Sequence, residues 1–283
     1  MRVKLSAKGL HVRLQRVRIP VGRRRMSALV LTPQHAVTAA PGVLWIHGGG
    51  YLTGMKEMVF MSRAVDLVER FGAVVMCPDY RLSWQAPYPA ALDDCCAALL
   101  WMRNHAAELG INPSQLMVGG ESAGGGLCAA LTLRVRDRGG VRIAYQMPLY
   151  PMIDNLDTPS SQDNRNKVWN TRRNHAAWRL YLRGDAKSPD ASPYAAPARA
   201  TDLANLPPTY TFVCTGEPFY AETLTYVERL RAAGVRAEVD VYDGLYHAFD
   251  MLEPDLPESV QACERFCEQY AWAVEHCFAE QDA

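Results

Sequence analysis

The sequence predicts an α/β fold in which a mostly parallel sheet is covered by helices on both faces. Short apolar segments suited to buried strands alternate with longer segments that have an apolar face and suit helices. Of the 283 residues, 49% are hydrophobic and 21% are charged, which is typical of a folded globular protein. A chain of this length forms one or two domains, and we expect a single domain over residues 1–283.

The first two expected strands flank Val21-Gly22, where a turn would join them as an antiparallel hairpin. The six strands that follow are short apolar segments, which suit strands buried on both faces of a parallel sheet. The expected strands cover residues 12–19, 27–31, 43–46, 73–77, 116–118, 143–147, 210–214 and 237–242.

Five longer segments are expected to form helices between and after these strands. Gly110 and Pro113 mark the end of the second helix, and Pro218 and Gly234 mark the start and the end of the fourth. The expected helices cover residues 58–70, 90–108, 123–137, 219–233 and 258–278.

Residues 150–208 break this alternation, because they are rich in Pro, Asn, Asp and Ser and contain one helical segment, at 175–182. A long irregular segment inside a compact domain is usually functional. This one follows the end of an expected strand, where sites form in α/β folds. We therefore expect residues 150–208 to be a lid or cap insertion within the single domain.

The charge balance excludes several classes of function. The chain has 30 basic and 30 acidic residues, so no excess of positive charge favours nucleic-acid binding. No apolar segment approaches the ~18 residues that a membrane span requires, and no apolar stretch follows Arg2, Lys4 and Lys8 as it would in a signal peptide. We expect a cytoplasmic protein with neither a membrane nor a nucleic-acid partner.

The eight cysteines form no C-x-x-C pair and lie near no spaced histidines, so a zinc site is not indicated. They are expected to be free thiols, most of them buried, in a reducing compartment. No metal and no organic cofactor is expected.

The sharpest chemical signal is Gly120-Glu121-Ser122-Ala123-Gly124, between an expected strand and an expected helix. The G-x-S-x-G pattern places a serine on a sharp, strained turn, where its hydroxyl is exposed at the edge of the sheet. Its small residues let strand and helix approach closely, and the helix N-terminus favours a developing oxyanion. Ser122 is therefore the expected nucleophile.

Two further motifs follow expected strands and so lie at the same edge of the sheet. His47-Gly48-Gly49-Gly50 matches the H-G-G-G oxyanion-hole pattern that accompanies G-x-S-x-G, and its glycines leave backbone N–H groups free to face a ligand. His247 lies after Ser122 in the chain, in the order that this type of site uses. Among the seven histidines it is the expected general base.

A carboxylate is needed to hold the tautomer of this histidine and to stabilise its cationic form. Glu217 fits best, because it lies between Ser122 and His247 in the sequence and directly follows an expected strand. The alternatives are Glu222, which lies inside a helix, Asp202, which precedes the strand, and Asp243, which is close to His247 in sequence.

With these motifs the chain resembles the hormone-sensitive-lipase-like carboxylesterase family of the α/β-hydrolases. The resemblance runs from about residue 43 to residue 249 and so covers most of the chain. The segments that carry it are His47-Gly48-Gly49-Gly50-Tyr51, Asp79-Tyr80-Arg81-Leu82, Tyr88-Pro89-Ala90-Ala91-Leu92-Asp93-Asp94, Gly120-Glu121-Ser122-Ala123-Gly124-Gly125, Glu217-Pro218-Phe219 and His247-Ala248-Phe249.

The resemblance implies an α/β-hydrolase fold and a serine carboxylesterase that hydrolyses small or short-acyl esters through an acyl-enzyme. It implies Ser122, Glu217 and His247 as catalytic residues, with an oxyanion hole formed by the backbone N–H groups of Gly48, Gly49 and Ala123. We also expect Tyr51, Glu121, Trp169 and Trp178 to bind the substrate. Related proteins often dimerise through an edge strand, which suggests a homodimer.

The chain departs from the family pattern at three places. The family's acid is usually Asp, so Glu217 is longer by one methylene, and Ser83-Trp84-Gln85 replaces the usual Ala-Pro-Glu. The family's N-terminal helical cap is mostly missing before residue 12, so residues 150–208 would provide most of the lid. A small lid favours an open site and short acyl groups over long-chain triacylglycerol.

The sequence also bears on three other functions. An amidase or acyltransferase would use the same catalytic residues, since one fold hosts many reactions. A non-catalytic small-molecule receptor usually lacks a member of the triad, whereas Ser122 and His247 are both present. A dinucleotide-binding enzyme is disfavoured, because no G-x-G-x-x-G motif opens the chain.

Overall fold

The computed structural model describes residues 10–35, 37–184 and 186–281, and these residues contain one eight-stranded sheet. The strands lie in the order β1-β2-β4-β3-β5-β6-β7-β8. β1 pairs with β2, and β2 with β4, in antiparallel fashion, whereas every pairing from β4 to β8 is parallel. The strands span Val12–Val21, Arg24–Pro33, Ala40–Ile46, Val74–Pro78, Ile111–Glu121, Tyr145–Leu149, Thr209–Cys214 and Ala237–Tyr242 for β1 to β8.

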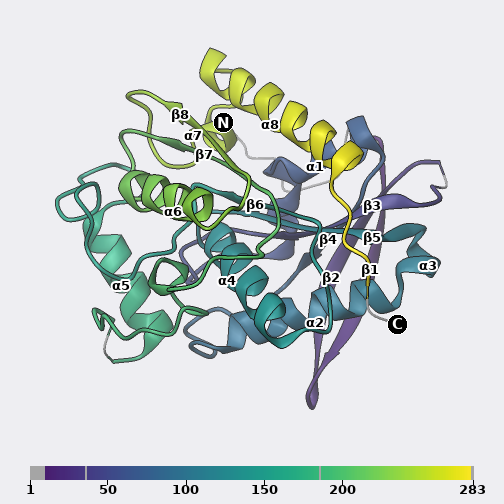
Figure 1. Ribbon diagram of the computed structural model, residues 1–283, viewed down its shortest axis with the longest axis horizontal. Coiled ribbons are helices and arrows are strands. Elements are labelled where there is room, and N and C mark those ends of the chain that lie inside the picture. The colour runs from purple at the N-terminus through teal and green to yellow at the C-terminus, as the bar shows by residue number, and fades with distance from the viewer. Residues whose placement is uncertain (1–9, 36, 185, 282–283) are drawn as a thin grey trace.

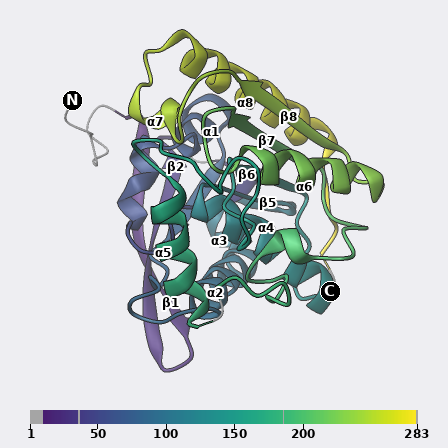
Figure 2. The same cartoon turned by 90° about the vertical axis from the view of Figure 1, so that its left-hand side faces the viewer.

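Helices cover both faces of the sheet, which confirms the predicted fold class (Figure 1, Figure 2). α1 and α8 pack on one face, and α2, α4 and α6 pack on the other. The helices span Ala64–Phe71, Ala90–Asn104, Ala106–Leu109, Ala123–Arg138, Thr171–Leu182, Tyr220–Ala232, Phe249–Leu252 and Pro257–His276 for α1 to α8, with 3₁₀ turns at Lys56–Met61 (η1) and Pro197–Arg199 (η2).

Two of the expected helices are interrupted. The segment expected over residues 58–70 divides into η1 and α1 at Ser62, whose hydroxyl donates to the Val59 carbonyl and accepts from the Ala64 N–H. Serine competes with helical backbone bonds in this way, which explains the break. The segment expected over residues 90–108 divides at His105, whose ring Nδ1 is bonded to the Trp101 carbonyl.

The third parallel strand is longer than expected, because β5 continues through Gly119 and Gly120 to Glu121. The absence of a side chain at Gly119 makes room for the ring of Trp45, which would lie 2.4 Å from an added Cβ atom. These glycines therefore permit close packing inside the strand. β5 delivers Ser122 directly to the carboxyl edge of the sheet, beside the loop that follows β3.

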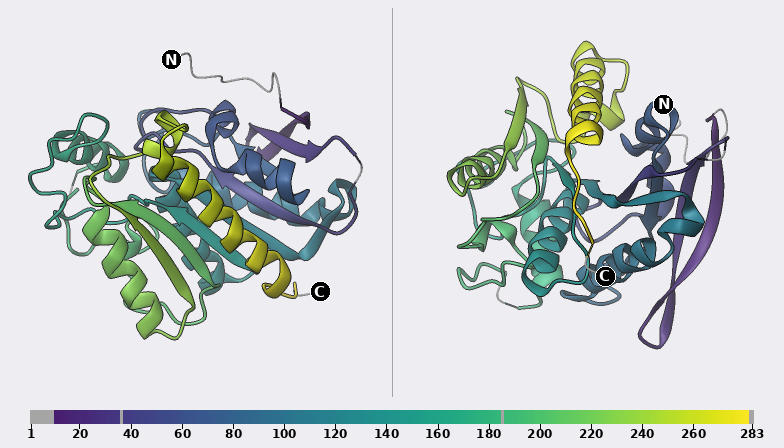
Figure 3. Two further views of the ribbon diagram at one scale, coloured as in Figure 1. Left: turned by 90° about the horizontal axis from the view of Figure 1, so that it is seen from above. Right: turned by 45° about the vertical axis from the view of Figure 1, so that its right-hand side comes forward.

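The hairpin of β1 and β2 continues past the end of β4 and projects from the body of the molecule (Figure 3). Ala28 pairs with Pro78, the last residue of β4, so residues 18–27 lie beyond the end of β4. With a rise of about 3.4 Å per residue, the hairpin projects by roughly 15 Å. We call residues 18–27 the arm.

Residues 150–208 connect β6 to β7 and contain α5 and η2. The helix starts four residues before the expected segment, because Asn170 caps it by accepting from the Arg173 N–H. Trp178 and Tyr181 of α5 are buried against Tyr51, so the base of this segment belongs to the core.

All eight cysteines are free thiols, and six of them are buried, as predicted. Within the ranges that the structure describes, no helix has the length and apolar character needed to cross a bilayer. Arg2, Lys4 and Lys8, on which the expected absence of a signal peptide depends, lie outside the described residues.

Candidate active site

Ser122 lies at the turn between β5 and α4 in a strained backbone conformation, with φ at +58°. Gly120 and Gly124 make this turn possible, because Cβ atoms at these positions would lie 2.4 and 2.0 Å from the carbonyl oxygen of Ile46. The Ser122 N–H donates to the Leu149 carbonyl at 3.0 Å. The surrounding backbone thus fixes a strained serine, as functional sites often do.

Ser122, His247 and Glu217 form one hydrogen-bonded row. The Ser122 Oγ lies 2.8 Å from His247 Nε2, and His247 Nδ1 is bonded to Glu217 Oε2. Side chains of all three are buried, at 1–6% exposure of the residue. A proton can therefore pass from the hydroxyl to the imidazole, while the carboxylate fixes the ring and faces the charge that forms on it.

The longer glutamate is accommodated by a second set of bonds. Its Oε1 accepts from the Cys214 N–H at 3.0 Å and from the Cys214 thiol at 3.2 Å, which leaves Oε2 facing the histidine. Burial and the neighbouring Glu217 raise the pKa of this thiol, so that it stays protonated as a donor.

The other acidic candidates have different partners. Asp243 accepts from the Thr215 hydroxyl at 2.8 Å, and Glu222 accepts from the N–H groups of Ile153 and Asp154. Asp202 is exposed, and its carbonyl accepts from Arg136. Glu217 is the carboxylate that the structure brings to His247.

The glycine loop after β3 is held in one conformation. Gly49 has φ at +112°, and a Cβ atom there would lie 2.1 Å from the carbonyl oxygen of Thr53. His47 stacks on Tyr80 with ring centroids 4.2 Å apart, and the Tyr80 hydroxyl donates to the His47 carbonyl. Burial lowers the pKa of His47 to about 4, so this ring is a neutral packing element at physiological pH.

Gly48 and Gly49 of this loop line the same cavity as Ser122. A Cβ atom on Gly48 would lie 3.0 Å from the Glu121 carbonyl oxygen, so the loop passes close to the end of β5. Ala123 begins α4, where the first N–H groups of a helix have no intrahelical partner. The structure thus brings the three expected oxyanion-hole residues close to Ser122.

The cavity at Ser122 measures about 180 Å³ and is almost wholly apolar in its exposed lining. Its walls come from the glycine loop, η1, the 150–208 segment and the start of α7, and comprise Gly48, Gly49, Gly50, Met58, Met61, Glu121, Ser122, Tyr150, Val168, Trp169, His247, Ala248, Met251 and Leu252. Met58, Met61 and Met251 were not predicted to line this cavity, because nothing in the sequence distinguishes them from apolar residues of the core.

Two of the four expected substrate-binding residues lie in this cavity. They are Trp169 and Glu121. The Trp169 ring packs on Gly50, where an added Cβ atom would lie 2.1 Å from that ring. The Glu121 carboxyl accepts a hydrogen bond from the Trp45 indole at 2.9 Å. Burial raises the pKa of Glu121 to about 8, which keeps this carboxyl largely protonated at neutral pH.

The other two expected substrate-binding residues lie elsewhere. Tyr51 is 1% exposed, donates to the Met152 carbonyl and stacks on Tyr181 at 4.0 Å. Trp178 is 2% exposed and packs against the same two tyrosines. Neither side chain lines the cavity at Ser122, and both belong to the core at α5. This corrects the expectation that Tyr51 and Trp178 contact the substrate.

Sequence reasoning missed a buried polar group beneath the histidine. The Tyr150 hydroxyl donates to Asp250 at 3.0 Å, and Arg63 faces the other oxygen of Asp250 at 3.6 Å. The ring edge of Tyr150 contacts His247, with centroids 5.1 Å apart. Burial raises the pKa of Asp250, and the nearby Arg63 opposes this shift. No motif marks this group, because its members come from separate segments of the chain.

Replacing Tyr150 with phenylalanine should lower the free energy of unfolding by about 1–3 kcal/mol, because Asp250 loses its hydroxyl partner inside the core. Tyr210→Phe is the matched control: it removes a similar bond, to Asp240 at 2.9 Å, where the carboxylate is partly exposed. Urea unfolding of both variants measures the difference. Equal losses of stability would contradict a special role for the buried pair.

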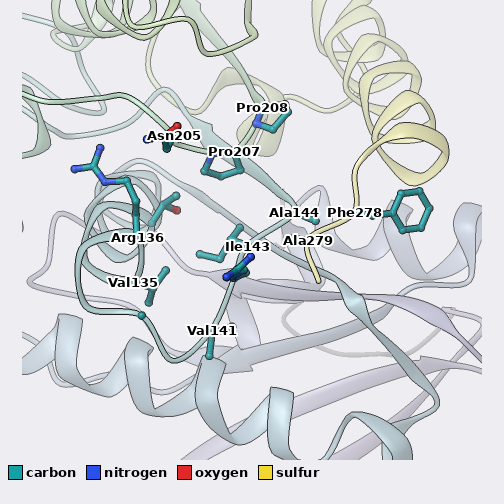
Figure 4. A pocket seen from close by; sticks show the side chains of 13 residues that line it. Val135, Arg136, Val141, Ile143, Ala144, Asn205, Pro207, Pro208, Phe278 and Ala279 are labelled. Carbon is teal, nitrogen blue, oxygen red and sulfur yellow. The ribbon is translucent and has the colours of Figure 1, made fainter. Parts of the chain in front are cut away.

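A larger cavity, of about 490 Å³, lies far from this site (Figure 4). It is lined by residues that precede β6 and β7, such as Ala144 and Pro208, and therefore lies at the opposite edge of the sheet. The Arg136 guanidinium at its wall donates to the carbonyls of Asp202 and Ala204. In the described part of the chain, no group of His, Cys, Asp or Glu side chains is arranged to hold a metal ion.

The fold and this row of side chains define a hydrolase of the α/β class. A family model described as the alpha/beta hydrolase fold matches residues 43–251. Esterase LipI of Mycobacterium tuberculosis is 33% identical over 230 residues, which cover 80% of this chain and 71% of that protein. The chain belongs to the hormone-sensitive-lipase-like carboxylesterase family, as the motifs indicated, and it is a carboxylic ester hydrolase.

Solved structures agree with this assignment. A bacterial heroin esterase is 35% identical with a TM-score of 0.85, over 90% of this chain and 82% of that one. An esterase of Pyrobaculum calidifontis is 32% identical with a TM-score of 0.84, over 93% of this chain and 86% of that one.

Proposed function

We propose that this enzyme hydrolyses small carboxylic esters with short acyl groups through an acyl-enzyme on Ser122. The observation that carries the proposal is the row of Ser122, His247 and Glu217 at the base of a small apolar cavity. His247 takes the proton of Ser122 as the hydroxyl attacks the ester carbonyl, and then returns it to the leaving alcohol. Water attacks the acyl-enzyme with help from the same histidine.

The negative charge that develops on the carbonyl oxygen needs donors in place before the reaction. The backbone N–H groups of Gly48, Gly49 and Ala123 are the proposed oxyanion hole, and losing one such donor typically costs ~10²–10³ in rate. The rigid glycine loop, held by Thr53 and by the stacked pair His47 and Tyr80, supports this assignment.

The size of the cavity supports the limit on substrate size. A cavity of about 150 Å³ accommodates a benzene molecule, so the 180 Å³ at Ser122 suits a short chain or a single ring. Residues 150–208 are the proposed lid within one domain over residues 1–283, and this segment contributes Val168 and Trp169 to the wall. Trp169 and Glu121 are the proposed substrate contacts.

The free thiols support a reducing compartment and hence a cytoplasmic location. β8 lies at one edge of the sheet, and its Val241 is 45% exposed. An uncovered edge strand supports a homodimer formed through β8.

Hydrolysis of p-nitrophenyl esters with acyl chains of two to sixteen carbons tests the proposed function. We expect kcat/KM to peak at the short chains, because longer chains exceed the cavity at Ser122. A burst of p-nitrophenol equal to the enzyme concentration would show the acyl-enzyme. A maximum of kcat/KM at the longest chains would contradict the proposal. Steady release of p-nitrophenol by a folded enzyme that forms no acyl-enzyme would contradict it as well.

A further inference from the structure

The charges of this neutral chain are unevenly distributed. The first 56 residues contain ten of the 30 lysines and arginines and none of the 30 acidic residues. The remaining residues therefore carry ten more acidic than basic side chains. Such separation of charge directs one end of a molecule toward anionic surfaces.

The arm concentrates this charge on an exposed face. Arg18, Arg23 and Arg25 are exposed, and none has an acidic partner among the described residues. Arg18 pairs across the hairpin with Ser27, and Arg25 pairs with Pro20, so both side chains point to the same face. Some arginines elsewhere are paired with acids, as are Arg70 with Glu264, Arg165 with Asp163 and Arg265 with Glu268. Arg172, Arg179 and Arg183, on or beside α5, are exposed without an acidic partner among the described residues, so the arm is one of two such groups.

The opposite face of the arm is fixed to the body of the protein. Ile19 and Met26 are each 1% exposed and pack in the core under α2, and Arg24 is paired with Asp94. The arm is therefore a rigid projection whose outer face presents arginines. The register of β2 on β4 places the arm past the end of β4, and the hairpin runs beside α2 (Figure 2).

Apolar side chains are exposed in the segments that follow β3 and β4. Trp84, 65% exposed, lies in the segment that follows β4, and its indole donates to the Leu52 carbonyl. Met55, 47% exposed, precedes η1, whose Met58 and Met61 line the cavity at Ser122. Arg16 of β1 reaches Glu57 of η1 at 3.8 Å, which links the basic hairpin to this wall.

We propose that the arm and Trp84 dock this enzyme on an anionic membrane surface, with the cavity at Ser122 turned toward the lipid. Arginines bind anionic headgroups, and tryptophan favours the interface between lipid and water. A nucleic-acid duplex would use the arginines but would gain little from the exposed Trp84 and Met55, because its bases are already stacked. The docking needs no membrane-spanning segment, so it agrees with the absence of such a helix in the described residues.

The docking deepens the proposed function, because apolar esters that suit the cavity concentrate in lipid. The docking is tested by vesicle binding without any ester substrate, so the proposed docking and the proposed ester hydrolysis can fail independently of each other. Sedimentation of the enzyme with phosphatidylcholine vesicles, with and without phosphatidylserine, measures binding at low and physiological salt. We expect binding to the phosphatidylserine vesicles alone, weaker at higher salt.

The key variant carries Arg18→Gln, Arg23→Gln and Arg25→Gln. Each arginine near an anionic membrane adds about fivefold to affinity, so this variant should bind about 100-fold more weakly. The matched control removes the same charge from paired arginines outside the arm and the cavity, as Arg70→Gln, Arg231→Gln and Arg265→Gln, and should bind nearly as the wild type does. Hydrolysis of soluble p-nitrophenyl acetate should be unchanged in both, which also shows that they fold.

Trp84→Ala separates a lipid surface from a nucleic acid. It should weaken vesicle binding several-fold, and it should leave any binding to a double-stranded DNA oligonucleotide unchanged. Three results would overturn the proposal: no binding of the wild type to anionic vesicles, equal losses in the arm variant and the charge-matched control, or DNA binding that is tighter than vesicle binding and depends on the arm alone.

Discussion

Ser122→Ala is expected to lower kcat for p-nitrophenyl acetate by a factor of about 10⁶, since the acyl-enzyme has no other nucleophile to form on. The alanine fits the same turn, because Gly120 and Gly124 still provide the close approach of β5 and α4. The measurement is the turnover of purified wild type and variant, with thermal unfolding to show that the fold is retained.

A fluorophosphonate probe gives an independent readout of the same serine. It should label the wild type once per chain and leave Ser122→Ala unlabelled. Residual labelling or turnover above a hundredth of the wild-type value would move the nucleophile to another side chain.

Glu217→Gln is expected to lower kcat by about 10⁴, the effect of forcing a catalytic histidine into the wrong tautomer. The Cys214 N–H requires an oxygen at the position of Oε1, so the amide nitrogen takes the position of Oε2 and faces His247 Nδ1. Nδ1 must then accept a hydrogen bond, and the proton moves to Nε2. Such a ring cannot take the proton of Ser122.

The control for this prediction is Asp243→Asn, the change at the alternative acid. Asp243 is bonded to the Thr215 hydroxyl, so its loss should change kcat by less than about threefold. The steady-state kinetics of both variants decide between the two carboxylates. A silent Glu217→Gln beside an inactive Asp243→Asn would assign the acid to Asp243.

Much of the fold followed from the sequence, because strands and helices leave periodic signals. The eight strands and the main helices lie close to their expected positions, whereas the breaks at Ser62 and His105 depend on single side-chain bonds. α7 was not expected, since four residues are too few to show a helical period.

The proposed catalytic residues could be named from the sequence because each follows the carboxyl end of a strand and therefore lies at one edge of the sheet. The residues that line the cavity could not be named from the sequence in this way. Met58, Met251 and Tyr150 resemble core residues until their distances to Ser122 are known. Tyr51 and Trp178 show the converse: an aromatic side chain beside a motif or within an insertion suggests a substrate contact, whereas these two pack in the core at α5.

The start of the 150–208 segment is bonded to Ser122 and to two neighbouring side chains. The Met152 N–H donates to the Ser122 carbonyl, the Tyr51 hydroxyl donates to the Met152 carbonyl, and Glu222 accepts from the next two N–H groups. α5 adds a second anchor through Trp178 and Tyr181. The loop between these anchors, which carries Trp169, is bonded to the segment around Glu217 instead: the Ser160 hydroxyl donates to the Pro218 carbonyl, and the side-chain amides of Asn164 and Asn166 donate to the Gly216 carbonyl. Exchanging residues 163–169 would therefore change ester selectivity and the support of the carboxylate together, so a graft of new selectivity has to keep these two asparagines.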